Sequence, residues 1–427
     1  MSAMAAEKER DLFDAMQALG QQAKDASAVL AVAKPTDKNQ AIRAAAEIVR
    51  SRMKEILIAN EQDLAAAVER GLSTAMLDRL KLTEDRIKAM AAGMMDIADF
   101  PDPVGKELST TERPNGLKIT KVSVPLGVIG IIYESRPNVT ADAGALCLKS
   151  GNAAILRGGS DSFHSSGLIL ECLQSGLRVA GLPAECIQRV PTTDREAVGI
   201  LLGMSEFVDV IVPRGGRGLI ERIQNEAKMP VFSHLDGLCH TYVDGSADLA
   251  MAQEIIVNAK MRRTGICGAT ETLLVDRSVA GDFLPDAIRA LQGRGCEVRG
   301  DEACREIIAT IAPTTEEDWD TEYLDAIISV KVVDGVAEAI DHINLHGSHH
   351  TEAVIAEDEE IAADFMNRVD AGIVMHNTST QFADGGEFGM GAEIGISTGK
   401  MHARGPVGAA ELTSYKYKVQ GTGQVRP

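Results

Sequence analysis

The sequence predicts an α/β protein with two domains, each built around a parallel sheet. From Gly127 onward, short apolar runs alternate with stretches of helical periodicity, which is the pattern of consecutive βαβ units. A second run of the same kind begins near Cys239. The chain has 427 residues, too many for one ordinary hydrophobic core, so we expect at least two domains.

The first hundred residues predict helices. Apolar side chains recur there at helical spacing and form one face, made of Ile42, Ala45, Val49, Met53 and Ile56. Thr83 precedes two acidic residues, which predicts a helix N-cap with negative charge at the positive helix end. Prolines at 101, 103 and 114 then indicate a loop.

Two segments outside the helices alternate like half-exposed strands. Residues 117–124 predict an extended arm, and residues 411–419 in the tail alternate again. We interpret the tail as a strand that pairs either with the arm or with a neighbouring subunit.

The two α/β runs contain the following expected elements. In the first run, strands are expected at 128–133, 153–157, 187–190, 208–212 and 230–232, with helices near 161–180, 194–203 and 217–227. In the second run, strands are expected at 272–275, 326–333, 353–356 and 373–376.

Composition limits the function classes. The net charge of −19 argues against general nucleic-acid binding. Seven cysteines, an odd number without metal-ligand spacing, are typical of a reduced intracellular protein. The N-terminus lacks a basic-then-apolar signal, and no apolar run approaches the ~18 residues of a membrane span. We therefore expect a cytoplasmic protein without membrane or nucleic-acid partners.

Cys267 is the candidate nucleophile. A thiol becomes a better nucleophile as its thiolate fraction rises, and nearby cations or backbone N–H groups raise that fraction. Arg262 and Arg263 supply such charge. The alternative is a buried, inert cysteine, the commonest state of an intracellular thiol.

Two glycine-rich turns are candidate phosphate sites. They follow predicted strands at residues 157–161 and 213–218, and parallel sheets bind ligands at the carboxyl ends of their strands. Glycines let backbone N–H groups reach a phosphate, which favours Gly158, Gly159, Gly215 and Gly216. Neither turn matches the G-x-G-x-x-G fingerprint, so ordinary tight turns remain the alternative.

The histidines give no sign of a metal site. The chain has nine, without metal-ligand spacing, and the neighbours His349 and His350 would point to opposite sides of a strand. We therefore predict that the protein holds no metal.

Residues 258–272 resemble the nucleophile loop of the aldehyde dehydrogenase superfamily, where a cysteine follows a glycine by two residues. Further matching segments occur in the superfamily's order and cover most of the chain after about residue 30: 124–138, 155–160, 212–216, 347–351 and 385–398. The resemblance implies an aldehyde dehydrogenase-like fold and a homo-oligomer. Its expected parts are a Rossmann-type cofactor-binding domain at 1–116 and 125–238, an α/β catalytic domain at 239–402, and a small β oligomerisation arm at 117–124 and 403–427.

The same resemblance implies a nicotinamide cofactor. Gly215 and Gly216 would lie by its pyrophosphate, and Glu322 matches the superfamily glutamate that holds the nicotinamide ribose, unless it is a solvated surface acid. Arg157 would stand near the adenosine ribose and suits a 2′-phosphate, so NADP(H) is expected.

The match is closer still to the branch of the superfamily that reduces acyl phosphates. It implies NADPH-dependent reduction of L-glutamyl 5-phosphate to L-glutamate 5-semialdehyde, a step of proline biosynthesis, through a Cys267 thioester. His234 begins the segment 234–237, where hydrolytic members carry Glu-Leu-Gly-Gly with a water-activating glutamate. Its absence protects a thioester from water, and His234 is either a base itself or structural. A CoA-acylating aldehyde dehydrogenase and a scaffold without chemistry are the alternatives.

The resemblance also suggests substrate contacts. Guanidinium groups match carboxylate and phosphate, which favours Arg136, Arg263 and Arg404, although each could instead be a surface or ion-pair residue. The polar residues expected at the amino-acid head or phosphate are Ser348, His349 and His350. The Cys267 N–H and Asn138 are expected to stabilise the oxyanion, with Ser135 as the alternative to Asn138. Because the substrate is labile, association with glutamate 5-kinase is a further expectation.

Overall fold

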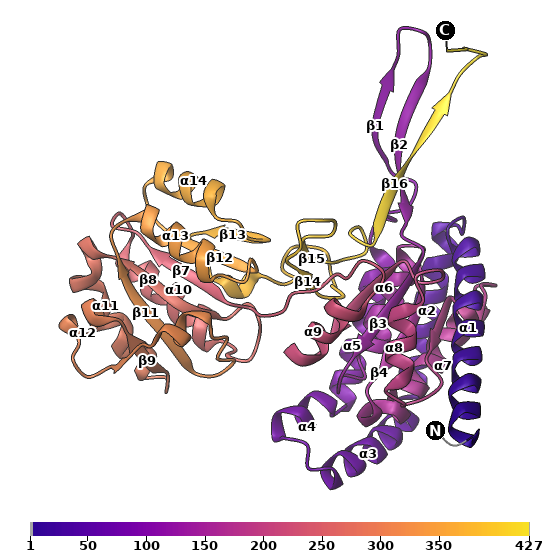
Figure 1. Ribbon diagram of the computed structural model, residues 1–427, viewed down its shortest axis with the longest axis horizontal. Coiled ribbons are helices and arrows are strands. Elements are labelled where there is room, and N and C mark those ends of the chain that lie inside the picture. The colour runs from indigo at the N-terminus through magenta and orange to yellow at the C-terminus, as the bar shows by residue number, and fades with distance from the viewer. Residues whose placement is uncertain (1–2, 427) are drawn as a thin grey trace. The chain divides into compact units, whose positions relative to one another are not determined.

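A computed structural model of the protein describes residues 3–426, and the chain divides in it into two compact units (Figure 1). Unit 1 holds the chain up to Ser233 together with Gly389–Gly395 and the tail from Val407 onward. Unit 2 holds His234–Phe388 and Ile396–Pro406. Each unit has its own parallel sheet, which confirms the predicted α/β class.

The sheet of unit 1 has four parallel strands in the order β5-β4-β3-β6. Their bounds are β3 (Val128–Tyr133), β4 (Ala153–Gly158), β5 (Ile187–Arg189) and β6 (Val210–Arg214). Every residue of β3 is buried, as expected for a strand covered on both faces. The strand expected at 230–232 is reduced to a single bridge between Val231 and Ile211.

The helices of unit 1 are α1 (Ala3–Leu30), α2 (Pro35–Ser51), α3 (Met53–Glu69), α4 (Thr74–Leu80), α5 (Glu84–Asp99), α6 (Val139–Lys149), α7 (Phe163–Val179), α8 (Glu196–Gly203) and α9 (Arg217–Glu226). The main contacts with the sheet strands come from α1, α6, α7 and α9. The Thr83 hydroxyl accepts the Arg86 N–H, which confirms the predicted N-cap. The apolar face predicted as one helix is divided by a break at Arg52 between α2 and α3, a change that hydrophobic spacing does not register.

A three-stranded antiparallel ribbon, β1-β2-β16, extends away from the helices of unit 1 (Figure 1). It comprises β1 (Glu107–Glu112), β2 (Lys118–Pro125) and β16 (Thr413–Gln420). β16 pairs with β2 along its whole length, so the tail strand joins the arm of its own chain. β1 lies where the prolines at 101, 103 and 114 predicted a loop; all six of its residues are exposed, so no apolar alternation marks the strand.

The sheet of unit 2 has seven parallel strands in the order β10-β9-β11-β8-β7-β12-β13. Their bounds are β7 (Cys239–Val243), β8 (Thr270–Asp276), β9 (Glu297–Gly300), β10 (Ala312–Pro313), β11 (Ile327–Val333), β12 (Thr351–Ile355) and β13 (Ile373–His376). A separate two-stranded sheet joins β14 (Ile396–Ser397) to β15 (Gly405–Pro406).

Both faces of the unit 2 sheet are covered by helices. The helices are α10 (Leu249–Met261), α11 (Arg277–Gln292), α12 (Glu302–Ile307), α13 (Val336–His346) and α14 (Glu359–Arg368). Along β8, Leu273 and Val275 pack in a core with Phe283 of α11, whereas Leu274 packs in another core with Phe365 of α14. Successive strand residues point to opposite faces, so α10, α11 and α12 cover one face and α13 and α14 the other. Among residues 3–426, no helix is long and apolar enough to span a membrane.

Candidate active site

Strand order in unit 2 brings three separate segments together. Cys267 lies just before β8, His234 just before β7, and His350 directly before β12. These strands are neighbours in the order β8-β7-β12 and run parallel, so their amino ends share one edge of the sheet. The site therefore forms at the amino-terminal edge of this sheet. Parallel sheets generally bind ligands at the opposite edge, beyond the carboxyl ends of their strands.

The backbone of Cys267 is held closely from the segment before β7. A Cβ on Gly237 would lie 2.3 Å from the Cys267 carbonyl oxygen and 2.6 Å from its Cβ, so only glycine permits this approach. The buried Cys239 thiol donates to the same carbonyl at 3.0 Å. The Cys267 side chain itself is half-buried, which leaves it accessible to a small molecule.

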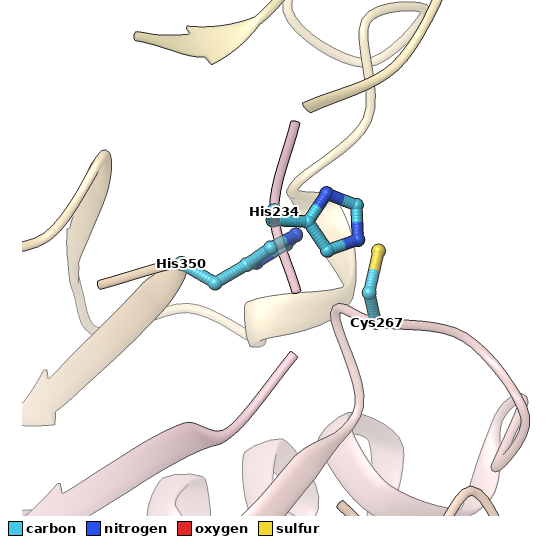
Figure 2. A group of neighbouring side chains, drawn as sticks. All are labelled: His234, Cys267 and His350. Carbon is cyan, nitrogen blue, oxygen red and sulfur yellow. The ribbon is translucent and has the colours of Figure 1, made fainter. Parts of the chain in front are cut away.

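Cys267, His234 and His350 form a cluster, called here the Cys–His cluster, whose ligand atoms all lie within 4.8 Å of one another. The His234 Nδ1 lies 2.8 Å from the Ile396 carbonyl. Because a carbonyl only accepts, Nδ1 carries the proton, and the neutral ring has its lone pair on Nε2. Figure 2 shows this outer ring nitrogen beside the Cys267 sulfur. His234 is thus placed to accept the thiol proton.

His350 supports this arrangement. Its ring meets the His234 ring edge-on, with centroids 4.9 Å apart, and its Nδ1 pairs with the Thr351 hydroxyl at 2.9 Å. The side chain is fully buried. His349 and His350 precede β12 and do not lie on a strand, because His349 has a positive φ of 60°. The strand geometry from which we argued against a metal is therefore absent.

Glu322 lies beside the nucleophile loop. It accepts the Gly237 N–H, and its pKa is raised, chiefly by burial, with the charge of Asp236 adding to the effect and that of His350 opposing it. Its role toward a nicotinamide ribose stays a prediction.

The segment that carries Glu322 rests on a buried ion pair. Lys260 and Glu271 are 0% and 1% exposed and bond to each other. The other oxygen of Glu271 accepts the Leu324 N–H at 3.4 Å. Burial raises the pKa of Glu271 to about 7, against the opposing charge of Lys260.

The residues proposed for the amino-acid head lie in two places. The Ser348 hydroxyl accepts the Leu238 N–H at 2.9 Å, next to the nucleophile loop. Arg404 and Lys400 instead bind Asp370, at 2.8 and 2.7 Å, and His349 bonds to the Asp370 carbonyl at 2.5 Å. Bonds from Lys400 and then Arg404 lower the Asp370 pKa to about 2. The Arg404 guanidinium thus already contacts a carboxylate.

Arg263 is exposed, and its carbonyl accepts the Gln381 side-chain amide at 3.1 Å. A cavity of about 780 Å³ adjoins the start of this loop at Arg262 and is lined by residues of α10, by Ala290 of α11 and by residues 377–382. Arg262 lines it, whereas Cys267 and the two clustered histidines do not.

In unit 1, the glycine-rich turns have close protein neighbours. The Gly216 N–H, at the start of α9, donates to the Glu134 carboxylate at 3.0 Å. A Cβ on Gly215 would lie 2.7 Å from that carboxylate, and one on Gly159 would lie 2.3 Å from Asp161. On Gly158 a Cβ would meet only the Tyr133 ring, at 3.1 Å. Close contacts with side chains explain Gly158, Gly159 and Gly215 whether or not a phosphate binds, whereas a Cβ on Gly216 would lie 4.0 Å from Glu134 and meets no such obstacle.

Arg157 is buried at the end of β4 and held by backbone carbonyls. It is 9% exposed, and its guanidinium donates to the carbonyls of Gly158 and Thr193 at 2.7 and 3.0 Å. The pKa of Arg157 is lowered, chiefly by burial. The charges of Arg195 and then Arg222 lower it further. The charges of Arg195 and Arg222 thus act on Arg157 against that of Asp161, while the Arg222 guanidinium pairs with Glu226 at 3.0 Å.

Asn138 and Arg136 follow β3, also in unit 1. The exposed Asn138 amide donates to Asp142 at 3.0 Å, and burial raises the pKa of that carboxyl to about 6. Arg136 is half-buried. The oxyanion and clamp roles of these two residues stay predictions.

Comparisons with known proteins agree with this geometry. Residues 4–305 match the model of the aldehyde dehydrogenase family. The γ-glutamyl phosphate reductase of Paramagnetospirillum magneticum is 61% identical over 98% of this chain and 99% of its own. The crystal structure of γ-glutamyl phosphate reductase from Thermotoga maritima is 44% identical, with a TM-score of 0.95 over 96% of this chain and 100% of that one. The chain belongs to the γ-glutamyl phosphate reductases of the aldehyde dehydrogenase family.

Membership confirms the resemblance seen in the sequence and makes the protein an oxidoreductase that acts on a small molecule, in a family that uses a nicotinamide cofactor. An acetylating aldehyde dehydrogenase from Geobacillus thermoglucosidasius also matches, at 17% identity and a TM-score of 0.68, which is a likeness of fold alone. The CoA-acylating alternative is therefore not favoured.

Sequence reasoning missed several residues of this site. Gly237 and Cys239 hold the nucleophile backbone, and Lys260 with Glu271 supports the Glu322 segment. A glycine directly after Asp236 was the available signal for the close approach at Gly237. No local pattern marks the others, because their contacts depend on strand order.

Proposed function

We propose that the protein reduces L-glutamyl 5-phosphate to L-glutamate 5-semialdehyde with NADPH, releasing phosphate, through a thioester on Cys267. The observation that carries this proposal is the half-buried Cys267 beside the lone-pair nitrogen of His234, at the position where hydrolytic relatives have their water-activating glutamate. The names of relatives at 58–61% identity over nearly the whole chain support the same reaction.

The residues perform the covalent steps as follows. His234 Nε2 takes the Cys267 proton, and the thiolate attacks the acyl carbon of the substrate. The acyl–oxygen bond to phosphate breaks, the leaving oxygen takes the proton from His234, and a thioester remains on Cys267. The bound cofactor supplies a hydride to this carbon. Collapse of the resulting oxyanion breaks the carbon–sulfur bond and releases the aldehyde, and the Cys267 thiolate then takes a proton from solvent to restore the thiol. The Cys267 N–H and Asn138 are proposed to stabilise the oxyanions.

Replacement of Cys267 tests this chemistry. We expect Cys267→Ala to lose nearly all turnover while it keeps its affinity for the dinucleotide, because the cofactor residues proposed in unit 1 are untouched. The assay follows phosphate-dependent NADP⁺ reduction with the semialdehyde, and fluorescence titration measures dinucleotide binding. The control is Cys296→Ala, which removes a thiol from the core of unit 2. Near-native turnover by Cys267→Ala would end the proposal, and turnover that requires CoA in place of phosphate would favour the acylating alternative.

We also propose NADP(H) as the cofactor. Arg195 is exposed, and its charge acts on the buried Arg157 at the end of β4, so a 2′-phosphate bound there would meet positive charge. Removing one guanidinium from a phosphate costs about 1.5–3 kcal/mol. Arg195→Ala should therefore lower kcat/KM for NADPH by roughly 10- to 100-fold and leave that for NADH unchanged. Arg178→Ala, on the exposed last turn of α7, is the control. Equal losses with both dinucleotides would contradict the assignment.

The ribbon is proposed to mediate self-association. Apolar side chains on its strands are about half exposed, namely Leu108, Tyr415, Tyr417 and Val419. Tyr417→Lys should shift the protein toward monomers in sedimentation velocity, and an unchanged sedimentation coefficient would contradict this role. Cytoplasmic location and association with glutamate 5-kinase are further proposals. A coupled assay without rate advantage over freely diffusing substrate would remove the latter.

A further inference from the structure

The Cys–His cluster offers the ligand set of a transition-metal site. One thiolate sulfur and two imidazole nitrogens suit zinc and its chemical analogues, whereas magnesium and calcium prefer oxygen ligands. The three ligand atoms lie within 4.8 Å of one another, the one such grouping among residues 3–426. Three protein ligands leave the fourth tetrahedral position open.

The geometry requires only a small adjustment. With Zn–S and Zn–N distances of ~2.3 and ~2.1 Å, tetrahedral ligand atoms lie ~3.6 Å apart. Because all pairs of the cluster lie within 4.8 Å, each needs to close by no more than about 1.2 Å. Cys267 and His234 are half-buried and lie in loops, so rotation of their side chains can supply this movement. His350 is fully buried and provides the fixed ligand.

The surroundings orient the ligands and supply negative charge. Metal-binding histidines usually bond through their second nitrogen to a carbonyl or other polar group. His234 bonds in this way to the Ile396 carbonyl, and His350 to the Thr351 hydroxyl. The Glu322 carboxyl interacts electrostatically with His350, and its ionised form favours a dication in the cluster.

We propose that Cys267, His234 and His350 bind one zinc-like divalent ion, and that this binding excludes formation of the thioester. The ion replaces the Cys267 thiol proton, which is released to solvent, and holds the sulfur lone pair needed to attack an acyl carbon. The inhibitory part rests on the proposed function, whereas the binding part does not. Metal-ligand spacing in the sequence does not mark this site, because its ligands come from three separate loops.

Cobalt provides the direct test of binding. Titration of the full chain with Co²⁺ should produce thiolate-to-cobalt absorption at one equivalent, and Zn²⁺ should abolish it. Cys267→Ala should lose the absorption, and His234→Ala and His350→Gln should weaken it, whereas His164→Ala, an exposed histidine of unit 1, should not. Absence of the absorption in the wild type, or equal binding in the His234 variant, would overturn the proposal. Because His350 is buried, the folding of His350→Gln is first checked by circular dichroism. If His350→Gln is unfolded, the cobalt absorption of His234→Ala alone tests the site.

Activity tests the inhibitory part separately. At free Zn²⁺ about 100 times its Kd, turnover and alkylation of Cys267 should fall to about 1% of the metal-free values, and a chelator should restore both. Binding of Co²⁺ with unchanged turnover would overturn the competition. If Cys267→Ala were active, the proposed function would fail, yet cobalt absorption in the wild type would still establish the metal site.

Discussion

Gly237→Ala is the sharpest test of how the nucleophile is held. The added Cβ would lie 2.3 Å from the Cys267 carbonyl oxygen, 2.5 Å from its Cα and 2.6 Å from its Cβ. Ordinary contacts between carbon atoms are ~3.5–4.0 Å, so the two backbones must separate by about 1 Å or more. The Glu322 carboxylate accepts the Gly237 N–H and resists that movement. We expect overpacking to cost ~1–3 kcal/mol of stability, and a 1 Å displacement of the nucleophile to lower kcat/KM by ~10²-fold.

The assay is phosphate-dependent NADP⁺ reduction with the semialdehyde, together with the rate of Cys267 alkylation and a dinucleotide titration. Affinity for the dinucleotide should fall far less than turnover, because the arginines and glycine-rich turns proposed to bind its phosphates lie in unit 1 and only Glu322 of the proposed cofactor residues adjoins Gly237. Gly265→Ala is the matched control in the same loop, since its Cβ would meet nothing closer than the Leu324 carbonyl at 3.7 Å. Wild-type turnover and alkylation in Gly237→Ala would refute the claim that this contact positions Cys267.

Two further predictions concern buried charges of unit 2. Lys260→Met leaves the Glu271 carboxylate buried without its partner, so the free energy of unfolding should fall by ~3–5 kcal/mol. Adding Glu271→Gln removes the unpaired charge and should restore most of this loss. Equal urea midpoints for the single and double variants would contradict this prediction. Burial opposes ionisation of Asp318, but hydrogen bonds, led by that from the Thr315 N–H, lower its pKa to about 2 from 3.8. Because the pKa of Asp318 is lower in the folded than in the unfolded state, its ionisation stabilises the fold by about 2 kcal/mol. This contribution is fully present above the pKa of the unfolded state and is lost as the pH falls through the pKa of the folded state. The stability gap between wild type and Asp318→Asn should therefore narrow by about half between pH ~6 and ~3, and a gap that is independent of pH would refute the assignment.

The elements that the sequence predicts best are those buried on both faces. β3 and β4 are continuous apolar runs, and such runs carry their own signal. β1 escaped prediction because all six of its residues are exposed, and β9 because it has only four residues and a single apolar side chain, Val298; pairing partners rather than side-chain patterns determine both strands. The break at Arg52 was missed for a related reason, since the apolar spacing continues across it.

The functional site likewise has residues that the local sequence marks and residues that only the fold brings together. Cys267 was found because its loop has a local family pattern, and the charge and glycine signals around it are short-range. Its assembly with His234 and His350 depends on the order β8-β7-β12, which joins segments far apart in the chain. The contact between Gly237 and Cys267 has the same origin, so it can be read only from three-dimensional structure.

The pairing of β16 with β2 has a consequence for synthesis on the ribosome. β1 and β2 emerge early, but the other edge of β2 waits for the last segment of the chain, after all of unit 2 has been translated. At ~5–20 residues per second this delay is on the order of tens of seconds. The buried Asn152, whose amide binds the Leu412 carbonyl at 2.8 Å, waits equally long for its partner. Throughout that interval the nascent chain presents an unpaired strand edge, the feature that chaperones must shield to prevent association between neighbouring polypeptides.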